Sequence, residues 1–334
     1  MEFLYLGGAN SIESRLAHRH GIPFAAVQSG SVRGQRPWTV LWNGLKVALG
    51  ALQAYMVMGR FRPDVVLVTG GYTSVPVVLA GHLRRIPILI YLPDIVPGLA
   101  IRRLSRWASR VAVSFAETTA SFAGGKAVVT GYPVRRQFID ADRHLAREKL
   151  QLTEDRPVVT VFGGSRGAHS INVAVAGALQ ALVSEAQLVH VCGADDIRDA
   201  EENRERLPEP LRGHYHPFAY LHEEMVDALA AADLVVARAG ASVLGEFPAL
   251  GLPSILVPYP YAGQHQEINA DYMVDHGAAV KLQDGDLQER LLSTVVGLLR
   301  DSGRLSEMRK GAQALSNVEA ASRIVRELQL LAGA

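Results

Sequence analysis

A chain of 334 residues is long enough for two domains of ordinary size, and its hydrophobic content of 49% is typical of a globular protein with filled cores. One cysteine, Cys192, excludes an internal disulfide and is usual in a reducing compartment. The net charge of +1 is unevenly distributed: residues 1–139 carry 16 Lys and Arg against 5 Asp and Glu, whereas residues 140–334 carry 18 against 28. The basic first half predicts an anionic partner such as a lipid leaflet, a lipid diphosphate or nucleic acid.

The first half of the chain alternates short apolar segments with amphipathic ones. This alternation predicts parallel βαβ units covered by helices on both faces. The longest apolar segment contains Asn43, Lys46 and two glycines, so it predicts an amphipathic or core helix and not a transmembrane span. Strands are expected at residues 3–6, 24–28, 65–69, 88–91 and 111–115, and helices at 13–20, 38–58, 75–83 and 98–108.

Six arginines between residues 84 and 110 carry much of the basic charge. They are interleaved with apolar residues and are not grouped with aromatic side chains, which favours a membrane surface over single-stranded nucleic acid. A solvated basic surface without a partner is the alternative.

A second series of strands and helices begins after Arg135. The charge sign reverses near residues 133–142, so we predict a first domain at 1–138, a second at 139–316 and a C-terminal helix at 317–334 that crosses back to the first domain. Two doubly wound sheets predict a cleft, with ligands at the carboxyl ends of the strands. Strands are expected at 158–162, 188–192, 216–221, 234–237, 254–257 and 279–282, and helices at 165–180, 223–231, 241–250 and 267–276, followed by three C-terminal helices.

A strand, a glycine-rich turn and a long helix follow one another directly at residues 158–180. Gly163, Gly164 and Gly167 allow a tight turn and a close approach of the backbone to a ligand, since they carry no Cβ. The helix is expected to begin near Ser165, which directs its unpaired N–H groups and the positive end of its dipole into the turn. The pattern predicts a phosphate site, and the alternative is a simple strand-to-helix connection.

Two further loops after buried strands carry polar side chains. Glu246 lies one turn into the helix that follows the turn at 238–242, where its carboxylate can accept hydrogen bonds from a ribose diol. Alone, Glu246 also fits an ordinary first-turn acid on a helix dipole. The loop at 258–269 supplies His265, Gln266 and Asn269, which suit either sugar hydroxyls or helix caps.

Together these segments resemble the MurG-type family of GT-B glycosyltransferases. The most specific motifs are GGSRGAHSIN at 163–172, RAGASVLGE at 238–246 and GLPSILVPYPYAGQHQEINA at 251–270, with support from GGYTSVP at 70–76 and GYPVR at 131–135. The resemblance covers nearly the whole chain. It implies an α/β fold of two doubly wound, Rossmann-like domains, of which the first faces the acceptor and the membrane and the second binds a UDP-sugar.

The resemblance also implies roles for individual residues. Ser165 and the glycine turn would hold the donor diphosphate, Arg135 would lie near the nucleotide, and Glu246 would bind the ribose. The backbone of Leu221 would meet the uracil, and the three side chains of the 258–269 loop would contact the sugar. The full donor-binding set is Arg135, Gly163, Gly164, Ser165, Gly167, Asn172, Leu221, Arg238, Gly240, Ala241, Ser242, Glu246, His265, Gln266 and Asn269, and the acceptor side comprises Gly70, Gly71 and Tyr72.

Two departures from the family pattern concern the first domain. The family begins with a strand, a GGTGGH-like loop that carries the usual catalytic His, and a helix, whereas this sequence starts at what resembles the second strand. Because the first strand of a doubly wound sheet is central, two strands would lack their common neighbour, so we expect either a longer protein or a rebuilt domain. The family's HEQN-like acceptor loop is replaced by Tyr91-Leu92-Pro93-Asp94. Asp94 is the candidate catalytic base, or else a turn residue after Pro93.

The implied reaction is an inverting transfer of N-acetylglucosamine from UDP-N-acetylglucosamine to a polyprenyl-diphosphate-linked muramyl-peptide, which converts lipid I to lipid II in peptidoglycan synthesis. No DxD-like acidic pair stands in a suitable loop, so neither a metal nor another cofactor is expected. The implied partners are the UDP-sugar, the lipid acceptor and an anionic membrane surface, without nucleic acid. The implied location is the cytoplasmic face of the cell membrane, as a peripheral protein.

Four alternatives remain open from the sequence. One is a paralogue that glycosylates another lipid acceptor, and another is a non-catalytic, membrane-associated protein that binds a UDP-sugar. A nucleotide-sugar epimerase has a related two-domain build but does not need the basic half. An NAD-dependent oxidoreductase fits less well, because the turn is GGxxG and Asp195 lies about thirty residues after Gly163, whereas the dinucleotide fingerprint has GxGxxG and a spacing of about twenty.

Overall fold

The computed structural model of the chain describes residues 2–30, 37–163, 168–260 and 265–333. It divides into two compact units, unit 1 (Met1–Tyr132 with Glu319–Ala334) and unit 2 (Pro133–Val318). The divisions therefore fall after residues 132 and 318, where the sequence suggested 138 and 316. In the described part of the chain, no helix combines the length and the apolarity needed to cross a membrane.

The described part of unit 1 contains two separate parallel sheets. One pairs β1 (Tyr5–Gly7) with β2 (Phe24–Ala26), and the other has the order β3 (Val66–Val68), β4 (Ile88–Leu92), β5 (Arg110–Val113), β6 (Ala127–Val129). Strand β6 was not predicted. Among the described residues β1 and β3 do not pair with each other. The helices of this unit are α1 (Ile12–Arg19), α2 (Pro37–Phe61), α3 (Ser74–Leu83), α4 (Leu99–Leu104), the 3-10 turn η1 (Ala116–Ser121) and α15 (Ala320–Ala332).

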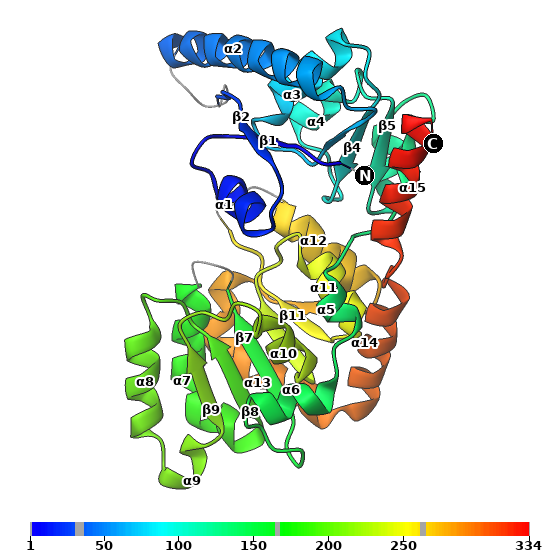
Figure 1. Cartoon of the computed structure of the whole chain (residues 1–334). Helices are drawn as coiled ribbons and strands as arrows, with labels where there is room; N and C mark the ends of the chain where they lie inside the picture. Colours follow the sequence, from blue (N-terminus) through cyan, green and yellow to red (C-terminus); the bar gives the residue numbers. More distant parts are fainter. Residues whose placement is uncertain (1, 31–36, 164–167, 261–264, 334) are drawn as a thin grey trace. The chain divides into compact units, whose positions relative to one another are not determined.

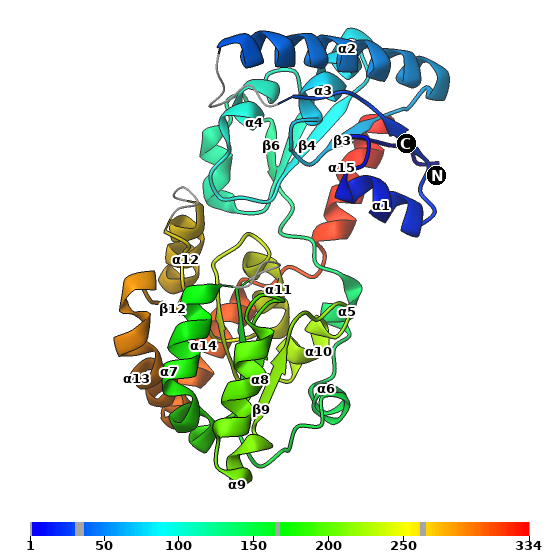
Figure 2. The ribbon, with the colours of Figure 1, turned by 90° about the vertical axis from the view of Figure 1, so that its left-hand side faces the viewer.

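Helix α2 is the predicted long apolar helix, and it lies along α3 (Figure 2). Its inward face places Ala54 and Met58 in a core with the β3–β4–β5 sheet. A Cβ at Gly50 would lie 1.9 Å from the carbonyl oxygen of Gln28, so only glycine permits this close approach to the segment after β2. The side chain of Gln53 accepts a hydrogen bond from the Gln28 N–H at 2.9 Å. Helix α2 thus connects the β1–β2 pair to the rest of unit 1.

Helix α15 packs on the face of β4 in unit 1 (Figure 1). Ile324 is 8% exposed and joins Leu89 and Tyr91 in a buried cluster. Glu327 forms an ion pair with Arg110 at 2.5 Å. The last helix of the chain is therefore a part of the first unit and covers an apolar face that would otherwise meet water.

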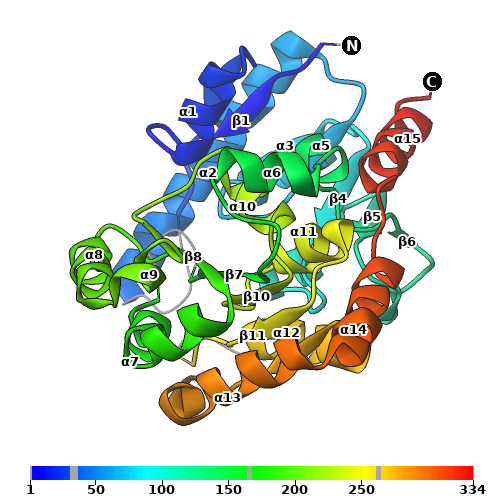
Figure 3. The ribbon, with the colours of Figure 1, turned by 90° about the horizontal axis from the view of Figure 1, so that it is seen from below.

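In the described part of unit 2, six parallel strands form one sheet of order β12-β11-β10-β7-β8-β9. Helices α7 and α13 cover one face, and α6 and α10 cover the other (Figure 3). The near-continuous apolar runs of the central strands follow from this coverage on both faces. The strands are β7 (Val158–Phe162), β8 (Gln187–Val191), β9 (Tyr215–Phe218), β10 (Leu234–Ala237), β11 (Ser254–Leu256) and β12 (Ala279–Lys281).

The helices of unit 2 that follow its strands agree closely with the predicted ones. Those without a clear apolar stripe were not predicted, namely α5, α6, α8 and α9. The helices are α5 (Arg136–Ile139), α6 (Arg143–Lys149), α7 (His169–Glu185), α8 (Ile197–Arg206), α9 (Glu209–Arg212), α10 (Met225–Ala230), α11 (Val243–Leu250), α12 (His265–Asp275), the 3-10 turn η2 (Asp284–Asp286), α13 (Leu287–Arg300) and α14 (Ser302–Ala314). The predicted class, two doubly wound Rossmann-like domains with parallel sheets, is confirmed.

Candidate functional site

The candidate donor residues of unit 2 lie at the carboxyl ends of its strands. Strand β7 pairs with β10, and β10 pairs with β11, so the loops after these three strands are neighbours in space. They are the loops that carry the glycine turn, Glu246 and the polar segment at 258–269. Strand polarity thus brings three segments, separated by tens of residues in sequence, to one edge of the sheet.

The glycine turn is described only at its two ends. Gly163 follows β7 and is half-buried, whereas Gly164, Ser165 and Gly167 lie outside the described residues. Helix α7 begins at His169, four residues later than expected, and its N-cap residue, Ala168, makes no side-chain capping hydrogen bond. A 17-residue helix whose N-terminus lies at this edge retains the dipole and the N–H groups that suit an anion.

Glu246 and Arg135 come together at this edge. Glu246 lies in the first turn of α11, and its carboxylate is 3.8 Å from an Arg135 guanidinium nitrogen. Burial raises the pKa of Glu246 above its ordinary value, although Arg135 and a hydrogen bond from Ser242 act in the opposite direction. Arg135 caps α5, which packs against α11. An acceptor-only carboxylate beside a guanidinium suits a ribose diol next to a phosphate.

The turn before α11 leaves open space at Gly240. A Cβ placed there would meet nothing within 4 Å, and its φ lies outside the left-handed region. Ala241 is half-buried and Ser242 is exposed. The small side chains of this turn therefore keep the backbone accessible, and the conformation itself does not demand glycine.

Three predicted donor contacts, Arg238, Asn172 and Asn269, point into the protein. Asn269 is 3% exposed and donates a hydrogen bond to the Ala239 carbonyl at 3.0 Å. Arg238 is also buried, and its guanidinium pairs with Asp284 at 2.6 Å. In this structure their donors hold the loops together, because buried polar atoms must be paired within the protein, and the contacts predicted between these side chains and the donor remain predictions.

Asn172 belongs to a buried network behind α7. Its Nδ2 donates to the Cys192 carbonyl at 2.7 Å and to Asp196 at 2.6 Å, and its Oδ1 lies 3.0 Å from Nε2 of His190. His190 in turn contacts the Tyr215 hydroxyl at 2.9 Å. Burial lowers the pKa of His190 to about 4, so the ring is neutral at physiological pH. Both ends of the Asn172 amide are engaged, which makes it a structural support for the start of α7.

The remaining donor candidates differ in exposure. His265 is exposed at the start of α12, and Gln266 accepts a hydrogen bond from the Tyr259 N–H at 2.8 Å. Leu221 follows β9 and is 9% exposed, between the exposed Tyr220 and His222, whose rings lie 4.6 Å apart. None of these observations tests the direct contacts predicted for His265, Gln266 and Leu221, which remain predictions.

The acceptor-side candidates of unit 1 form a turn after β3. Gly70 has a φ of 106° and Gly71 a φ of 82°, conformations that side chains of L-residues rarely adopt. Ser74, at the start of α3, donates its hydroxyl proton to the Gly70 carbonyl. Tyr72 is 60% exposed. The two glycines thus hold a sharp turn that presents Tyr72 to its surroundings.

The segment Tyr91-Leu92-Pro93-Asp94 ends β4 and continues beyond it. Tyr91 is buried, and its hydroxyl lies 2.8 Å from the Ser114 hydroxyl. Burial raises the pKa of Tyr91, and the nearby Asp94 carboxylate adds to this effect. Asp94 is half-buried just past the carboxyl end of the strand. Its predicted role as a base remains a prediction, and Tyr91 is a member of the apolar cluster under α15.

Two family models match this chain, and named relatives match nearly all of it. The N-terminal domain of glycosyltransferase family 28 matches residues 1–113, and its C-terminal domain matches residues 158–324. A protein of Roseiflexus sp. (strain RS-1), named UDP-N-acetylglucosamine--N-acetylmuramyl-(pentapeptide) pyrophosphoryl-undecaprenol N-acetylglucosamine transferase, is 40% identical over 98% of this chain and 83% of its own length. Its namesake in Desulforudis audaxviator (strain MP104C) is 39% identical, over 99% of this chain and 91% of its own length. The crystal structure of Acinetobacter baumannii MurG superposes with a TM-score of 0.78 and 25% identity, over 98% of this chain and 91% of that one.

This chain is a MurG-type member of glycosyltransferase family 28. The family expected from the glycine turn and the two later motifs is confirmed. Membership excludes the oxidoreductase and leaves the epimerase without support, since relatives that match almost end to end are named as transferases.

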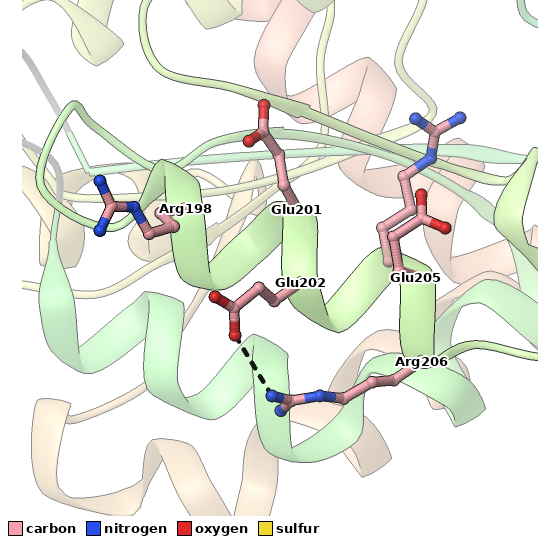
Figure 4. A pocket seen from close by; sticks show the side chains of 6 residues that line it. Arg198, Glu201, Glu202, Glu205 and Arg206 are labelled. Carbon is pink, nitrogen blue, oxygen red and sulfur yellow. Dashed lines mark hydrogen bonds and ion pairs between the residues drawn. The ribbon is translucent and has the colours of Figure 1, made fainter.

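A charged hollow on α8 lies apart from the MurG-type motifs. Figure 4 shows its lining, in which Glu202 and Arg206 form an ion pair at 3.2 Å, one turn apart on the same helix. Both side chains are more than half exposed, so the pair resembles an ordinary solvated helix surface. Among the described residues, no group of three or more His, Cys, Asp or Glu is placed to hold a metal ion together.

The sequence interpretation missed two residues of the site, Ser170 and Asp284. Ser170 stands inside the GGSRGAHSIN motif, and Asp284 follows the strand predicted at 279–282. A carboxylate just after a strand that ends at the binding edge was the available signal for Asp284. The sequence could not identify Arg238 as the partner of Asp284, because only the fold brings these two side chains together.

Proposed function

We propose that this chain transfers N-acetylglucosamine from UDP-N-acetylglucosamine to N-acetylmuramyl-(pentapeptide) pyrophosphoryl-undecaprenol, the reaction for which its relatives are named. The observation that carries the proposal is the match to those relatives over 98–99% of this chain. Support comes from the carboxyl edge of the unit 2 sheet, where Glu246, Arg135 and the start of α7 provide the chemistry that a nucleoside diphosphate requires.

In the proposed mechanism a hydroxyl oxygen of the acceptor attacks the anomeric carbon of the donor sugar. The bond from that carbon to the diphosphate oxygen breaks, UDP departs with the electron pair, and the configuration inverts. Glu246 holds the ribose, while the positive end of α7 and Arg135 oppose the charge that develops on the diphosphate. Asp94 is the proposed acceptor of the hydroxyl proton. The predicted contacts of His265, Gln266 and Leu221 complete the donor site.

A second acceptor class is favoured by one specific observation. The tetrapeptide Tyr91-Leu92-Pro93-Asp94 stands in place of the family's HEQN-like acceptor loop, and the side chain of Tyr91 packs in the apolar cluster under α15. A changed acceptor loop beside a donor domain that matches the family is what a paralogue for another polyprenyl or lipid acceptor would have. The test is therefore run with more than one acceptor: turnover of the muramyl-pentapeptide lipid supports the first proposal, and turnover of another lipid diphosphate alone supports the second.

We further propose that unit 1 binds the cytoplasmic face of the cell membrane through α2, as a peripheral protein. Trp42, Leu45, Leu49, Leu52 and Met56 repeat at the spacing of one helix face, and each is 44–59% exposed. Trp42, Leu45 and Leu49 also line a hollow that contains Lys46. Large apolar side chains in a row on a basic unit suit the interface of an anionic bilayer.

Replacing Leu45 and Leu52 by Gln should lower binding to vesicles that contain phosphatidylglycerol by roughly tenfold, because two exposed leucines lose their apolar contact with the bilayer. Sedimentation with vesicles measures this partition. The matched control replaces Leu145 and Val173 of unit 2, which are 57% and 40% exposed, by Gln. Equal binding of the α2 variant and the control to vesicles would contradict the role of α2 in membrane binding. Vesicle binding that does not change when salt is added would contradict the role of the basic charge.

A further inference from the structure

One buried cluster links the carboxyl ends of four neighbouring strands in unit 2. Arg238 follows β10, Asp284 follows β12, and Ser170 lies in the first turn of α7, after β7. The Arg238 guanidinium also donates to the carbonyls of Val257 and Pro258, just after β11, at 3.3 Å each. Since β12, β11, β10 and β7 are consecutive in the sheet, three side chains link the part of the edge that carries the glycine turn, the turn before Glu246 and the loop after β11.

The contacts within the cluster form a closed ring. One terminal nitrogen of Arg238 lies 2.6 Å from Oδ1 of Asp284, and the other donates to the Ser170 hydroxyl at 2.7 Å. That hydroxyl donates in turn to Oδ1 of Asp284 at 2.7 Å. The side chain of Arg238 is 9% exposed and that of Asp284 is 24% exposed. A guanidinium buried to this degree needs its counter-charge, so the ring is sensitive to the loss of either partner.

Each member of the ring borders a segment with a proposed donor role. Ser170 is the second residue of α7, whose N-terminus is proposed to face the diphosphate. Pro258 begins the loop that leads to Gln266, and Ala239, next to Arg238, accepts the hydrogen bond from Asn269. The ring therefore fixes the start of α7 against both the turn before Glu246 and the loop after β11.

We propose that Asp284 and Ser170 are positioning residues of the donor site, which act through Arg238 to hold the start of α7 and the loop after β11 in the geometry that binds the donor diphosphate. The inference rests on the proposed donor function. It assigns these two side chains no contact with the substrate.

Replacing Asp284 by Asn keeps the size of the side chain and removes the charge that Arg238 requires. We expect the Kd for UDP and for UDP-N-acetylglucosamine to rise about tenfold, because a buried hydrogen-bond donor without its charged partner has a free-energy penalty of this size. Ser170→Ala keeps the ion pair and should raise both Kd values about threefold. The two losses should not add in the double variant, because both act through one ring. Asp286→Asn is the matched control: Asp286 lies in the same turn, η2, and forms an ion pair with Arg290, one helical turn further on, at 3.4 Å.

Calorimetry gives the Kd values, and hydrogen exchange of residues 168–172 and 256–260 provides the local readout. The proposal is supported if both substitutions weaken donor binding and speed exchange in these two segments, while the control behaves like the wild type. It is overturned if Asp284→Asn and Ser170→Ala bind like the control, or if exchange rises evenly throughout unit 2. If Asp284→Asn fails to fold, Ser170→Ala decides. A wild-type chain that binds neither UDP nor the UDP-sugar overturns the donor site itself, and this result is seen before any variant is compared.

Discussion

Glu246→Gln should raise the Kd for UDP-N-acetylglucosamine by roughly 30- to 100-fold, since a neutral amide replaces a carboxylate that accepts charge-assisted hydrogen bonds from the ribose. The side chain is half-buried next to Arg135, so Gln fits the same space and keeps one acceptor. Calorimetry with the wild type and the variant measures the loss.

The fold of the Glu246→Gln variant should be at least as stable as that of the wild type. Burial holds the pKa of Glu246 above its usual value, so the unfolded chain gives up this proton at a lower pH than the folded chain does. The group therefore favours folding at low pH and loses that contribution as the pH rises through its folded pKa. An uncharged Gln removes the free-energy cost of burying a charged carboxylate at neutral pH. Weaker donor binding without a lower melting temperature is the expected combination.

The pH dependence of donor binding gives the same carboxylate a second test. As the pH falls through the raised pKa of Glu246, the side chain takes up a proton and ceases to be a pure acceptor. Wild-type affinity should fall in that range, which lies above the ordinary glutamate pKa of 4.5, whereas the Gln variant should show no such fall.

Glu289→Gln is the control for the simpler interpretation of Glu246 as a first-turn acid on a helix dipole. Glu289 is an exposed acid in the first turn of α13, a helix that carries none of the predicted donor residues. Unchanged donor affinity in the Glu246 variant, or an equal loss in the Glu289 variant, would contradict the ribose assignment.

Ending the chain at Asn317 should lower the free energy of unfolding of unit 1 by about 3–5 kcal/mol, because the truncation removes one buried and two partly buried apolar side chains of α15. These are Ile324, Leu328 and Leu331, which cover Leu89 and Tyr91 on β4. The loss also leaves Arg110 without Glu327. Hydrogen exchange should become faster throughout the β3–β6 sheet and remain unchanged in the β7–β12 sheet.

Two point variants on α15 test whether its buried side chains, and not only the presence of the helix, stabilise unit 1. Ile324→Ala should lower stability by roughly 2–4 kcal/mol, since Ile324 is 8% exposed. Val325→Ala, next in the chain and 44% exposed, should have little effect. Unchanged exchange in unit 1 after the truncation, or equal effects of the two point variants, would refute the role of α15 as a cover of the first sheet.

The sequence was most informative where hydrophobic periodicity and glycine chemistry act locally. Strands β7 and β10 were predicted at their observed bounds, and most other strands within two residues, because buried parallel strands are short apolar runs between turn signals. Strand β6 was missed, since three residues between a glycine pair and Thr130 give little periodic signal. Helix α8 was missed because IRDAEENRER has almost no apolar face.

The site was predictable in its location and only partly in its contacts. Strand polarity alone placed the polar loops at one edge, as observed. Residue type could not tell that the amides of Asn172 and Asn269 and the guanidinium of Arg238 turn inward, because their partners are distant in sequence. Cys192 lies 20 residues from Asn172, Ala239 lies 30 residues from Asn269, and Asp284 lies 46 residues from Arg238. Tertiary structure decides whether a polar side chain supports a loop or meets a ligand.

The most direct test is a transfer assay with the purified chain and phosphatidylglycerol vesicles. The donor is UDP-N-acetylglucosamine and the acceptor is N-acetylmuramyl-(pentapeptide) pyrophosphoryl-undecaprenol. The assay follows both the release of UDP and the mass of the lipid. UDP-glucose and a polyprenyl diphosphate without the muramyl-peptide serve as the comparison donor and acceptor, and Glu246→Gln as the matched variant. We predict release of UDP together with the gain of one N-acetylhexosamine on the lipid, selective for the first donor and strongly reduced in the variant. Selective binding of the donor by a cooperatively folded chain, with no change in the mass of any acceptor, would contradict transfer and leave a non-catalytic UDP-sugar-binding protein.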